Sequence, residues 1–527
     1  MRLPSPLHAL AKNAIERELG GYRRAVHRDD PNLPECPSGD APRVAVVGAG
    51  VAGIAAAVTL AERGFAVTLL ERNAYLGGKC GAWPVTVGDE TQSVDHGFHA
   101  FFRHYYNLSE LLKKTGVAAH LVPIDDYVVM RTDRSRISFR GTETVPLLNL
   151  LSLASTGVYR VSELLFSKKM HRLDPFLRYD EEKTFADWDD VSYDDFARHA
   201  DLPKDLRLVF NTFARAFFSE GDRLSVAALI RAFHFYYLSN DAGLLYDYLD
   251  DDYETAFAAP IRRWLEAHGV TVSLDTEVKS LERDGDGWSI DGARFESVVL
   301  ACDVRGAQAI AAGSTSLREA HPGFAAKVES QPRSQRYAIL RVWCDQRVGD
   351  ELPVFVISDR LKLLDAVTFN HRVVPAAKAW AEKNGGGVYE LHSYAVPDDL
   401  PDNAAIEREL LREFEHYFPG VTKGAVAATH LHVRADFAAF HVGTHARRAT
   451  VETGVPGLWL AGDWVRLPHT ATLLEAACMA GLLAANGILA ARGLREAPVY
   501  AVPAKGVLAR LPAPPKSMGV APPRVPV

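Results

Sequence analysis

The chain has 527 residues, which is too long for one hydrophobic core and predicts two or three interleaved lobes. Its 48% hydrophobic and 24% charged residues are typical of a globular protein, and a formal net charge of −7 argues against nucleic acid as a partner. The five cysteines are scattered and form no CxxC pair, which argues against a disulfide framework or a zinc site and favours a reducing cytoplasm.

Residues 1–42 are predicted to form an N-terminal helix and a linker. Apolar residues from Leu3 to Leu19 recur at near-helical spacing with basic residues among them, which predicts an amphipathic helix. Two interpretations stay open: the helix anchors the protein to a membrane interface, or it packs on the protein's own body. We recognise no apolar run of about 18 residues and no signal peptide, so the expected location is cytoplasmic, with peripheral binding to the inner face of the cell membrane as an option.

The stretch from Arg43 to Trp83 predicts a dinucleotide site. A short strand, 43–47, runs into Gly48-Ala49-Gly50-Val51-Ala52-Gly53 and an apolar helix, and a second strand, 66–70, ends on Glu71. The first glycine permits the tight turn, the second lets the backbone approach a pyrophosphate, and the third lets the helix pack closely on the strands. Glu71 can accept both hydroxyls of a ribose, which points to NAD or FAD and not to NADP. The predicted cofactor contacts of this stretch are Gly48, Gly50, Ala52, Gly53, Glu71 and Arg72.

A second glycine pair decides between the two dinucleotides. Leu76-Gly77-Gly78-Lys79 follows the acid, and the segments GAGVAGIAAA, LLERN and LGGK together resemble the FAD-binding signature of the flavin amine oxidase and phytoene-desaturase superfamily. In that superfamily the second pair and the following basic residue wrap the FAD phosphates and the flavin, which implies FAD contacts at Gly77, Gly78 and Lys79. NAD enzymes of the Rossmann type do not need this pair.

Two later segments extend the resemblance. Residues 276–281 resemble the segment that holds the adenine edge through its backbone, which implies a contact at Val278. The run 455–481 resembles the closing motif of the superfamily, which implies that Gly462 and Asp463 meet the pyrophosphate and ribityl chain, and that Met479 and its neighbours place helix N–H groups beside the flavin ring. The usual E-G-A of this motif is Glu475-Ala476-Ala477 here, so a close backbone approach at Ala476 is in question.

The resemblance implies an α/β fold in which a Rossmann-like FAD-binding lobe is built from separated segments, with an antiparallel-sheet substrate domain and a helical lid. The acidic run 246–254 is predicted to be a solvated loop, and the proline-rich tail is predicted to be disordered. The predicted division is 1–42 (helix and linker), 43–145 (first part of the FAD-binding lobe), 146–268 (helical substrate or lid region), 269–310 (second part of the lobe), 311–450 (substrate domain), 451–495 (third part of the lobe) and 496–527 (tail).

The segment Asp95–Asn107, DHGFHAFFRHYYN, suggests the chemistry. It most resembles the carotene desaturase/methyltransferases of the isorenieratene-synthase type, which implies hydride abstraction from a carotenoid or similar polyene, with ring desaturation and methyl migration. His96 and His99 lie on the turn expected beside the flavin and are the candidate proton acceptors. The alternative is that either histidine only hydrogen-bonds the turn or the flavin. With His104 they lack a helical i, i+4 pair, so no metal site is predicted.

Three other functions stay open. They are a linear carotene desaturase or isomerase or a hydroxysqualene-type isoprenoid enzyme, a flavin amine oxidase, and a flavin-binding scaffold without turnover. Amine oxidases of the superfamily place an aromatic ring two residues before the closing-motif Glu, where this chain has Leu473. An apolar wall suits a hydrocarbon better than a charged amine. The expected partners are therefore a lipophilic polyene and a membrane surface, and the sequence does not identify the electron acceptor.

Overall fold

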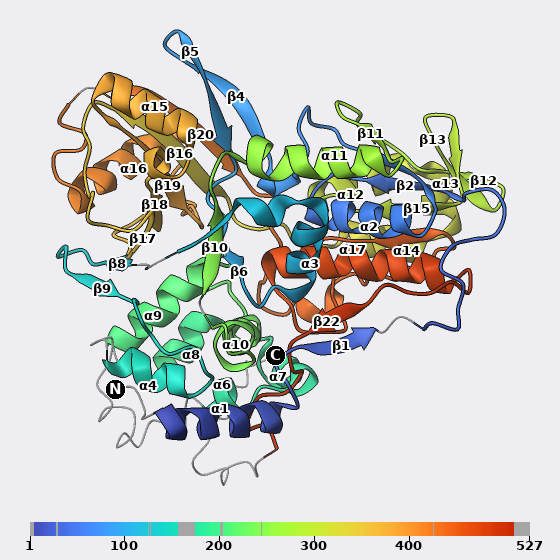
Figure 1. Cartoon of the computed structure of the whole chain (residues 1–527), viewed down its shortest axis with the longest axis horizontal. Coiled ribbons are helices and arrows are strands. Elements are labelled where there is room, and N and C mark those ends of the chain that lie inside the picture. The colour runs from blue at the N-terminus through green and yellow to red at the C-terminus, as the bar shows by residue number, and fades with distance from the viewer. Residues whose placement is uncertain are drawn as a thin grey trace.

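A computed structural model of the chain describes residues 5–27, 30–124, 126, 128–155, 174–200, 204–243, 245–424 and 426–510. Figure 1 shows three groups of elements. A parallel sheet and its helices lie at the right of the view, a second large sheet with two helices lies at the left, and a group of helices lies below them. The predicted α/β architecture is confirmed.

The first group is a parallel sheet assembled from three separate stretches of sequence. Its order is β11-β3-β2-β15-β21, and every neighbouring pair is parallel. The strands β2, β15 and β21 are nearly continuous apolar runs because the sheet is covered by α2 on one side and contacted by the small sheet β12-β13-β14. Their bounds are β2 Arg43–Val47, β3 Ala66–Leu70, β11 Thr271–Ser273, β15 Ser297–Leu300 and β21 Leu458–Leu460.

Two apolar helices form the centre of this lobe. They are α2 (Val51–Glu62) and α17 (Leu473–Ala490), which pack against each other. A Cβ placed on Gly481 would lie 2.1 Å from the Ala52 carbonyl oxygen, so the close backbone approach occurs at Gly481. Ala476 is buried without such a constraint.

Helix α17 corrects one expectation from the sequence. Within the described residues it is the one helix long and apolar enough to cross a membrane, with a mean hydropathy of 1.7 over 18 residues. Of this window 67% is buried inside the protein. A helix that is apolar all round is also what a core position requires, and α17 occupies such a position against α2.

The second group is a seven-stranded sheet of order β20-β16-β19-β18-β17-β8-β9, antiparallel except for the parallel pair β17–β8. One face packs on α16 through residues such as Leu340 and Leu391. The opposite face carries Arg341 in register with Glu390, and Ile339 in register with His392. The bounds are β8 Val128–Met130, β9 Arg136–Ser138, β16 Tyr337–Cys344, β17 Phe355–Ser358, β18 Ala366–Thr368, β19 Gly387–Ser393, β20 Val426–Arg434, α15 Pro375–Asn384 and α16 Asn403–Tyr417.

The third group is helical and lies below the two sheets (Figure 1). Its members are α1 Ser5–Leu19, α4 Leu148–Ser155, α6 Asp174–Leu177, α7 Glu181–Trp188, α8 Tyr193–His199, α9 Lys204–Arg215, α10 Val226–Phe233 and the π-helix η4 His234–Leu238. The α1 segment packs on the protein through buried Leu19 and an ion pair of 2.7 Å between Lys12 and Asp241, while Leu10 is 66% exposed.

The remaining elements complete the cofactor lobe and its edges. The helices are α3 Tyr106–Thr115, η5 Glu254–Ala258, α11 Ala259–Ala267, α12 Val304–Gly313, α13 Thr315–Ala320 and α14 Pro322–Glu329, with short 3₁₀ turns η1 Gly78–Cys80, η2 Val117–His120, η6 Asn370–Arg372 and η7 His445–Arg447. The strands are β1 Arg24–His27, β4 Ala82–Val87, β5 Glu90–Asp95, β6 Phe101–Phe102, β7 Leu121–Pro123, β10 Tyr246–Leu249, β12 Glu282–Asp284, β13 Gly287–Ile290, β14 Ala293–Phe295 and β22 Val499–Ala501.

Several predicted boundaries differ from the structure because tertiary contacts reassign short segments. Strands β8 and β9 lie within predicted lobe 43–145 but join the seven-stranded sheet. Helix α11 lies within the predicted lid, 146–268, but packs on α2, α3 and β11 of the cofactor lobe. Helix α14 lies within the predicted substrate domain, 311–450, but packs on α12 of the cofactor lobe.

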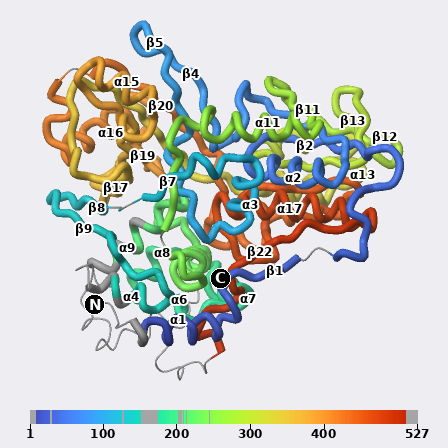
Figure 2. Tube along the Cα trace, in the orientation of Figure 1, coloured from blue at the N-terminus to red at the C-terminus, as the bar shows by residue number. Residues whose placement is uncertain are grey.

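Two segments predicted to be irregular are ordered instead. The acidic run 246–254 begins with β10, which pairs between β6 and β7 and buries Tyr246. The start of the predicted tail forms β22, which pairs with β1, so segments near the two ends of the chain lie side by side (Figure 2). His234 donates from Nε2 to the Pro503 carbonyl at 2.7 Å, which ties this segment to the helical group. The rest of the tail, 511–527, lies outside the described residues.

Candidate active site

A single cavity of about 940 Å³ lies where the three groups of elements meet. This volume is at the upper end of the range for ligand pockets. One end is lined by the start of α2 and the glycine-rich loops, the middle by the turn 96–100, and the other end by α9, η4 and the seven-stranded sheet.

The two glycine-rich loops contact each other at the first end. Gly48 has φ +105°, and a Cβ there would lie 2.7 Å from the Ala301 carbonyl oxygen. A Cβ on Gly53 would lie 1.9 Å from the Gly48 oxygen, so this glycine serves helix packing, as predicted, and does not line the cavity. Gly77 donates to the Ala49 carbonyl at 2.9 Å, and a Cβ on Gly78 would meet the Gly50 Cα at 2.9 Å. The second glycine pair, Gly77 and Gly78, therefore packs directly against the first glycine loop.

Glu71 lines the cavity and is already part of the turn. Its Oε2 accepts from the Ala49 N–H at 2.8 Å, and its Oε1 accepts from Asn73 through the backbone N–H and the side-chain amide. A carboxylate has about four acceptor positions, so it can still accept from a ligand hydroxyl. Glu71 thus both shapes the glycine loop and faces the cavity.

The other predicted cofactor residues are placed as follows. Ala52, Val278 and Gly462 line the cavity, and Arg72 lines it while pairing with Asp303 at 3.5 Å. Met479 is fully buried and does not line the cavity. The first turn of α17 lines the cavity instead. Only this turn has N–H groups without intrahelical partners, so it is the part of the helix that can donate hydrogen bonds to a ligand. Its N-cap, Thr472, makes no side-chain cap bond.

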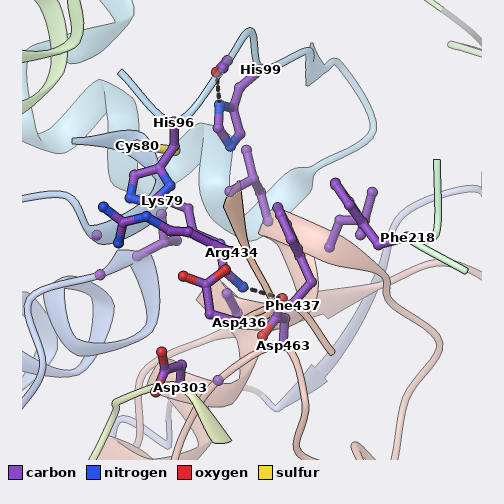
Figure 3. Close-up of a pocket in the computed structure, with 18 of the residues that line it drawn as sticks. Lys79, Cys80, His96, His99, Phe218, Asp303, Arg434, Asp436, Phe437 and Asp463 are labelled. Atoms are coloured by element: carbon purple, nitrogen blue, oxygen red, sulfur yellow. Dashed lines mark hydrogen bonds and ion pairs between the residues drawn. The ribbon is translucent and has the colours of Figure 1, made fainter. Parts of the chain in front are cut away.

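Lys79 and Asp463 both line the cavity and contact each other (Figure 3). The Lys79 Nζ lies 3.2 Å from Asp463 Oδ2 and 4.0 Å from the centre of the Phe437 ring. Burial alone would lower the pKa of Lys79, but Asp463, Asp436 and Asp303 outweigh it and raise this pKa. The amine therefore stays charged and supplies one fixed cation at this point.

A buried ion network holds the turn 95–99 on the seven-stranded sheet. Arg341 Nη2 pairs with Asp95 Oδ2 at 3.2 Å and with Glu390 Oε2, and all three side chains are buried. Asp95 Oδ1 accepts from the Gly97 N–H, and Glu390 Oε1 accepts from the Phe98 N–H at 2.8 Å. Burial and the nearby Glu390 raise the pKa of Asp95 to about 7. Each charge depends on the others because none of them is solvated.

The two candidate histidines have different surroundings. Both nitrogens of His96 lie 3.3 Å from tyrosine hydroxyls, those of Tyr75 and Tyr337. Tyr337 also donates to Asp436, so the hydroxyl can accept from His96. His99 Nδ1 donates to the Gly97 carbonyl at 2.7 Å, and burial lowers the pKa of His99 to about 4. His99 is therefore neutral near pH 7, with Nε2 unprotonated.

His104, the third histidine of the segment, is fully buried among the rings of Phe102, Phe235 and Tyr236. Burial lowers the pKa of His104 to about 3. Among the described residues, no group of three or more His, Cys, Asp or Glu side chains is arranged to hold a metal ion.

The far end of the cavity is apolar. Its lining includes Val129, Ile137, Phe139, Phe213, Phe217, Tyr236, Tyr237, Tyr246, Phe355 and Ile357. Phe218 and Leu473 also line the cavity and have φ of +54° and +51°, which is unusual for non-glycine residues and costs about 1–3 kcal/mol each. Phe218 stacks on Phe437 with ring centres 3.5 Å apart. Such strain persists where packing determines the conformation, as it does at binding sites.

Sequence reasoning missed Arg341, Glu390, His392 and Phe218. A signal for three of them is present: Arg341 interrupts the apolar strand YAILRVWC, and Glu390 and His392 alternate within GVYELHS. Alternation places the last two on one face of a strand. Which face meets the cavity depends on the sheet order, which the sequence does not contain.

Comparison with known proteins adds the family. Residues 51–489 match the family described as flavin containing amine oxidoreductases. The chain belongs to this family. It is 33% identical to a carotenoid phi-ring synthase of Streptomyces griseus, over 90% of this chain and 93% of the relative, and 28% identical to a carotenoid phi-ring synthase of Chlorobaculum tepidum, over 89% and 91%. A zeta-carotene desaturase of Synechocystis is 27% identical over 50% of this chain and 58% of the relative.

Solved structures of a putrescine oxidase and of other oxidoreductases share the fold. A putrescine oxidase variant has a TM-score of 0.59 and 14% identity, and the match covers 85% of this chain and all of the other. An oxidoreductase from Methanosarcina mazei has a TM-score of 0.58 and 16% identity, with 84% and 99% covered. As a member of the family, the protein is a flavin-dependent oxidoreductase.

The residues around the first end of the cavity fit a flavin nucleotide. A Cβ on Gly50 would meet only the Gly78 Cα, at 4.0 Å, so this position is open toward the cavity that it lines. Gly50 is also the N-cap of α2 and offers no side-chain cap. The N–H groups of a helix start and its dipole bind phosphate, and bound flavin would be held there and at the α17 start.

The ion network generates a stability prediction. Arg341→Met should lower the free energy of unfolding by about 3–5 kcal/mol, because it leaves two buried carboxylates without their cation. Urea titrations of the flavin-loaded protein measure this loss. The matched control is Arg136→Met, which removes an ion pair whose side chains are 45% and 61% exposed. The control should change the free energy by less than about 1 kcal/mol. Equal small losses in both variants would contradict the network's role.

Proposed function

We propose that the protein is an FAD-dependent oxidoreductase that abstracts hydride from a carotenoid or similar polyene and converts a β-ring into an aromatic ring by methyl migration. The observation that carries this proposal is the cavity, which continues from the glycine loops into a space lined by aromatic and aliphatic side chains. A hydrocarbon enters such a space without losing hydrogen bonds, whereas a charged amine would be desolvated at high cost. The names of the two near-full-length relatives support the same substrate class.

The choice of FAD rests on Glu71 and on the two helix starts that meet the cavity. Glu71 retains acceptor capacity for a ribose hydroxyl, and Val278 lines the cavity near it as an adenine contact would require. The α2 and α17 helix starts offer N–H groups at two separate points of the same cavity. A dinucleotide is long enough to contact both helix starts, whereas a mononucleotide needs only one of them.

Ring aromatisation fits what these residues can do. When bound, the flavin supplies the acceptor for hydride. Hydride loss leaves an allylic cation conjugated with the polyene, and aromatisation then requires one of two geminal methyl groups to move to the neighbouring carbon. The chain's part is to hold the ring, to exclude water from the cation and to remove a proton. Each aromatised ring loses two hydrides and two protons and no carbon.

The cofactor assignment predicts a specific loss of affinity. Glu71→Ala should weaken FAD binding by about ten- to a hundredfold, because charge-assisted hydrogen bonds are worth about 1.5–3 kcal/mol. Titration of the cofactor-stripped protein with FAD, followed by flavin fluorescence, measures this change. Glu62→Ala on the exposed end of α2 is the control and should bind FAD like the wild type. Release of a nicotinamide nucleotide, or of FMN, from the purified protein would contradict the assignment.

The substrate assignment predicts a product. Expression in a host that accumulates β-carotene should yield carotenoids lighter by the hydrogens of one or two aromatised rings, as measured by mass spectrometry. The half-length similarity to zeta-carotene desaturase makes a linear carotene the comparison substrate, offered in a parallel host. Unchanged β-carotene together with desaturation of the linear carotene would replace ring aromatisation by linear desaturation. Flavin reduction by a primary amine and by neither carotene would favour an amine oxidase.

We further propose that the protein works in the cytoplasm at a membrane surface, because carotenoids dissolve in the bilayer. Exposed Leu10 on α1, with basic residues near it, is the feature that supports this location. Leu10→Asp should lower co-sedimentation with liposomes severalfold, while Leu33→Asp, at another exposed leucine, should not. Unchanged sedimentation of the Leu10 variant would show that α1 is not the membrane contact.

A further inference from the structure

His392 and Glu390 form a histidine–carboxylate pair. The hydrogen-bond partners of His96 and His99, on the turn 95–99, are tyrosine hydroxyls and a backbone carbonyl instead. The histidine–carboxylate pair lies on one face of β19, and His392 Nε2 is 3.1 Å from Glu390 Oε1 and 3.1 Å from the Thr368 hydroxyl. An ionised carboxylate only accepts hydrogen bonds, so Nε2 carries the hydrogen and Nδ1 of the neutral ring is left with a lone pair. The carboxylate thereby fixes the tautomer of the imidazole.

The other edge of this imidazole reaches the cavity beside Gly97. His392 lines the cavity, and its Nδ1 has no hydrogen-bond partner in the described part of the chain. A Cβ on Gly97 would lie 3.2 Å from His392 Cε1 and 3.4 Å from Nδ1. Gly97 has φ +116°, where side chains are strongly disfavoured. The glycine of the D-H-G turn therefore leaves the Nδ1 edge of His392 uncovered.

Neither predicted proton acceptor combines these features. Both nitrogens of His96 face tyrosine hydroxyls, which occupies its lone pair. His99 has a free Nε2, but the partner of its Nδ1 is a backbone carbonyl, and burial holds the pKa of His99 at about 4. An imidazolium at His392 would be paired with a buried carboxylate at once, whereas one at His99 would not.

We propose that His392 Nδ1 accepts a proton that the cationic substrate ring loses after hydride transfer, and that Glu390 is its positioning residue. This proposal rests on the proposed function. In the step, a C–H bond of the cationic ring breaks, its electron pair becomes a ring double bond, and the proton bonds to Nδ1. The positive charge moves to the imidazolium beside Glu390. The step consumes no oxidant, because both electrons of the oxidation left with the preceding hydride.

A second, small cavity borders the carboxylate of this pair. It measures about 20 Å³, enough for one water molecule, and lies behind Glu390 and Asp95. Thr368 and the partly exposed Asp251 also line it.

The test uses flavin-loaded protein and β-carotene in detergent micelles, with a soluble quinone added to reoxidise the flavin, because each aromatised ring gives up two hydrides and one flavin accepts only one. The initial rate of product formation is measured. His392→Ala should keep its flavin and slow product formation by about a hundredfold or more. Added imidazole should restore at least about a tenth of the wild-type rate to this variant, but not to His392→Gln, whose side chain fills the space. Glu390→Gln should lower the rate at saturating β-carotene and leave the half-saturating concentration unchanged. His430→Ala, on the same sheet but outside the cavity lining, is the control and should react like the wild type.

The outcomes separate the two proposals. If the wild type forms no product, the proposed function fails. If the wild type reacts and His392→Ala reacts equally fast, or His99→Ala is the variant that imidazole rescues, the assignment of His392 is overturned. If the alanine variant loses its flavin, the glutamine variant decides: a wild-type rate overturns the assignment, and a slow rate with flavin retained supports it.

Discussion

The buried bridge from Arg341 to Asp95 and Glu390 is the interaction on which the site depends. Asp95 ends a hairpin that continues from the cofactor lobe, and the other two residues belong to the seven-stranded sheet, so the bridge joins the two largest parts of the molecule. Two carboxyl groups and a guanidinium without solvent are stable only in this mutual arrangement. The arrangement fixes the turn that carries Gly97 and His99 against the sheet face that carries His392. The proposed proton acceptor is thereby placed by a bridge whose cation, Arg341, does not itself line the cavity.

The cofactor end is organised by backbone contacts. Gly48, Gly53 and Gly481 each stand where a Cβ would strike a carbonyl oxygen, so the turn, α2 and α17 approach as closely as backbones can. This packing brings the uncapped starts of two helices to one cavity. The positive ends of both helices then face the same ligand.

The substrate end depends on aromatic packing. Phe437 contacts both the Phe218 ring and the Lys79 amine, which links the turn after α9, the segment after β20 and the second glycine loop. The left-handed backbone at Phe218 and Leu473 shows that these side chains are held in place by their surroundings. A dry, shaped cavity is what a transient cation requires.

The sequence by itself determined the features that local patterns encode: strand 43–47, the glycine turn, helix α2, strand 66–70 and Glu71 are contiguous, and each needs only its neighbours in the chain. It also identified the flavin family, because three separated motifs occur in the right order. Only the tertiary structure decided that α17 is a core helix, that 246–249 and 499–501 are strands, and that the first turn of α17 rather than Met479 faces the cavity. The tertiary structure alone joined Asp95 to Arg341 and Glu390, and placed His392 beside Gly97 in the cavity lining. The physical reason is that pairing, burial and the cavity-facing side of a strand are set by residues far apart in the chain, and a local pattern does not record them.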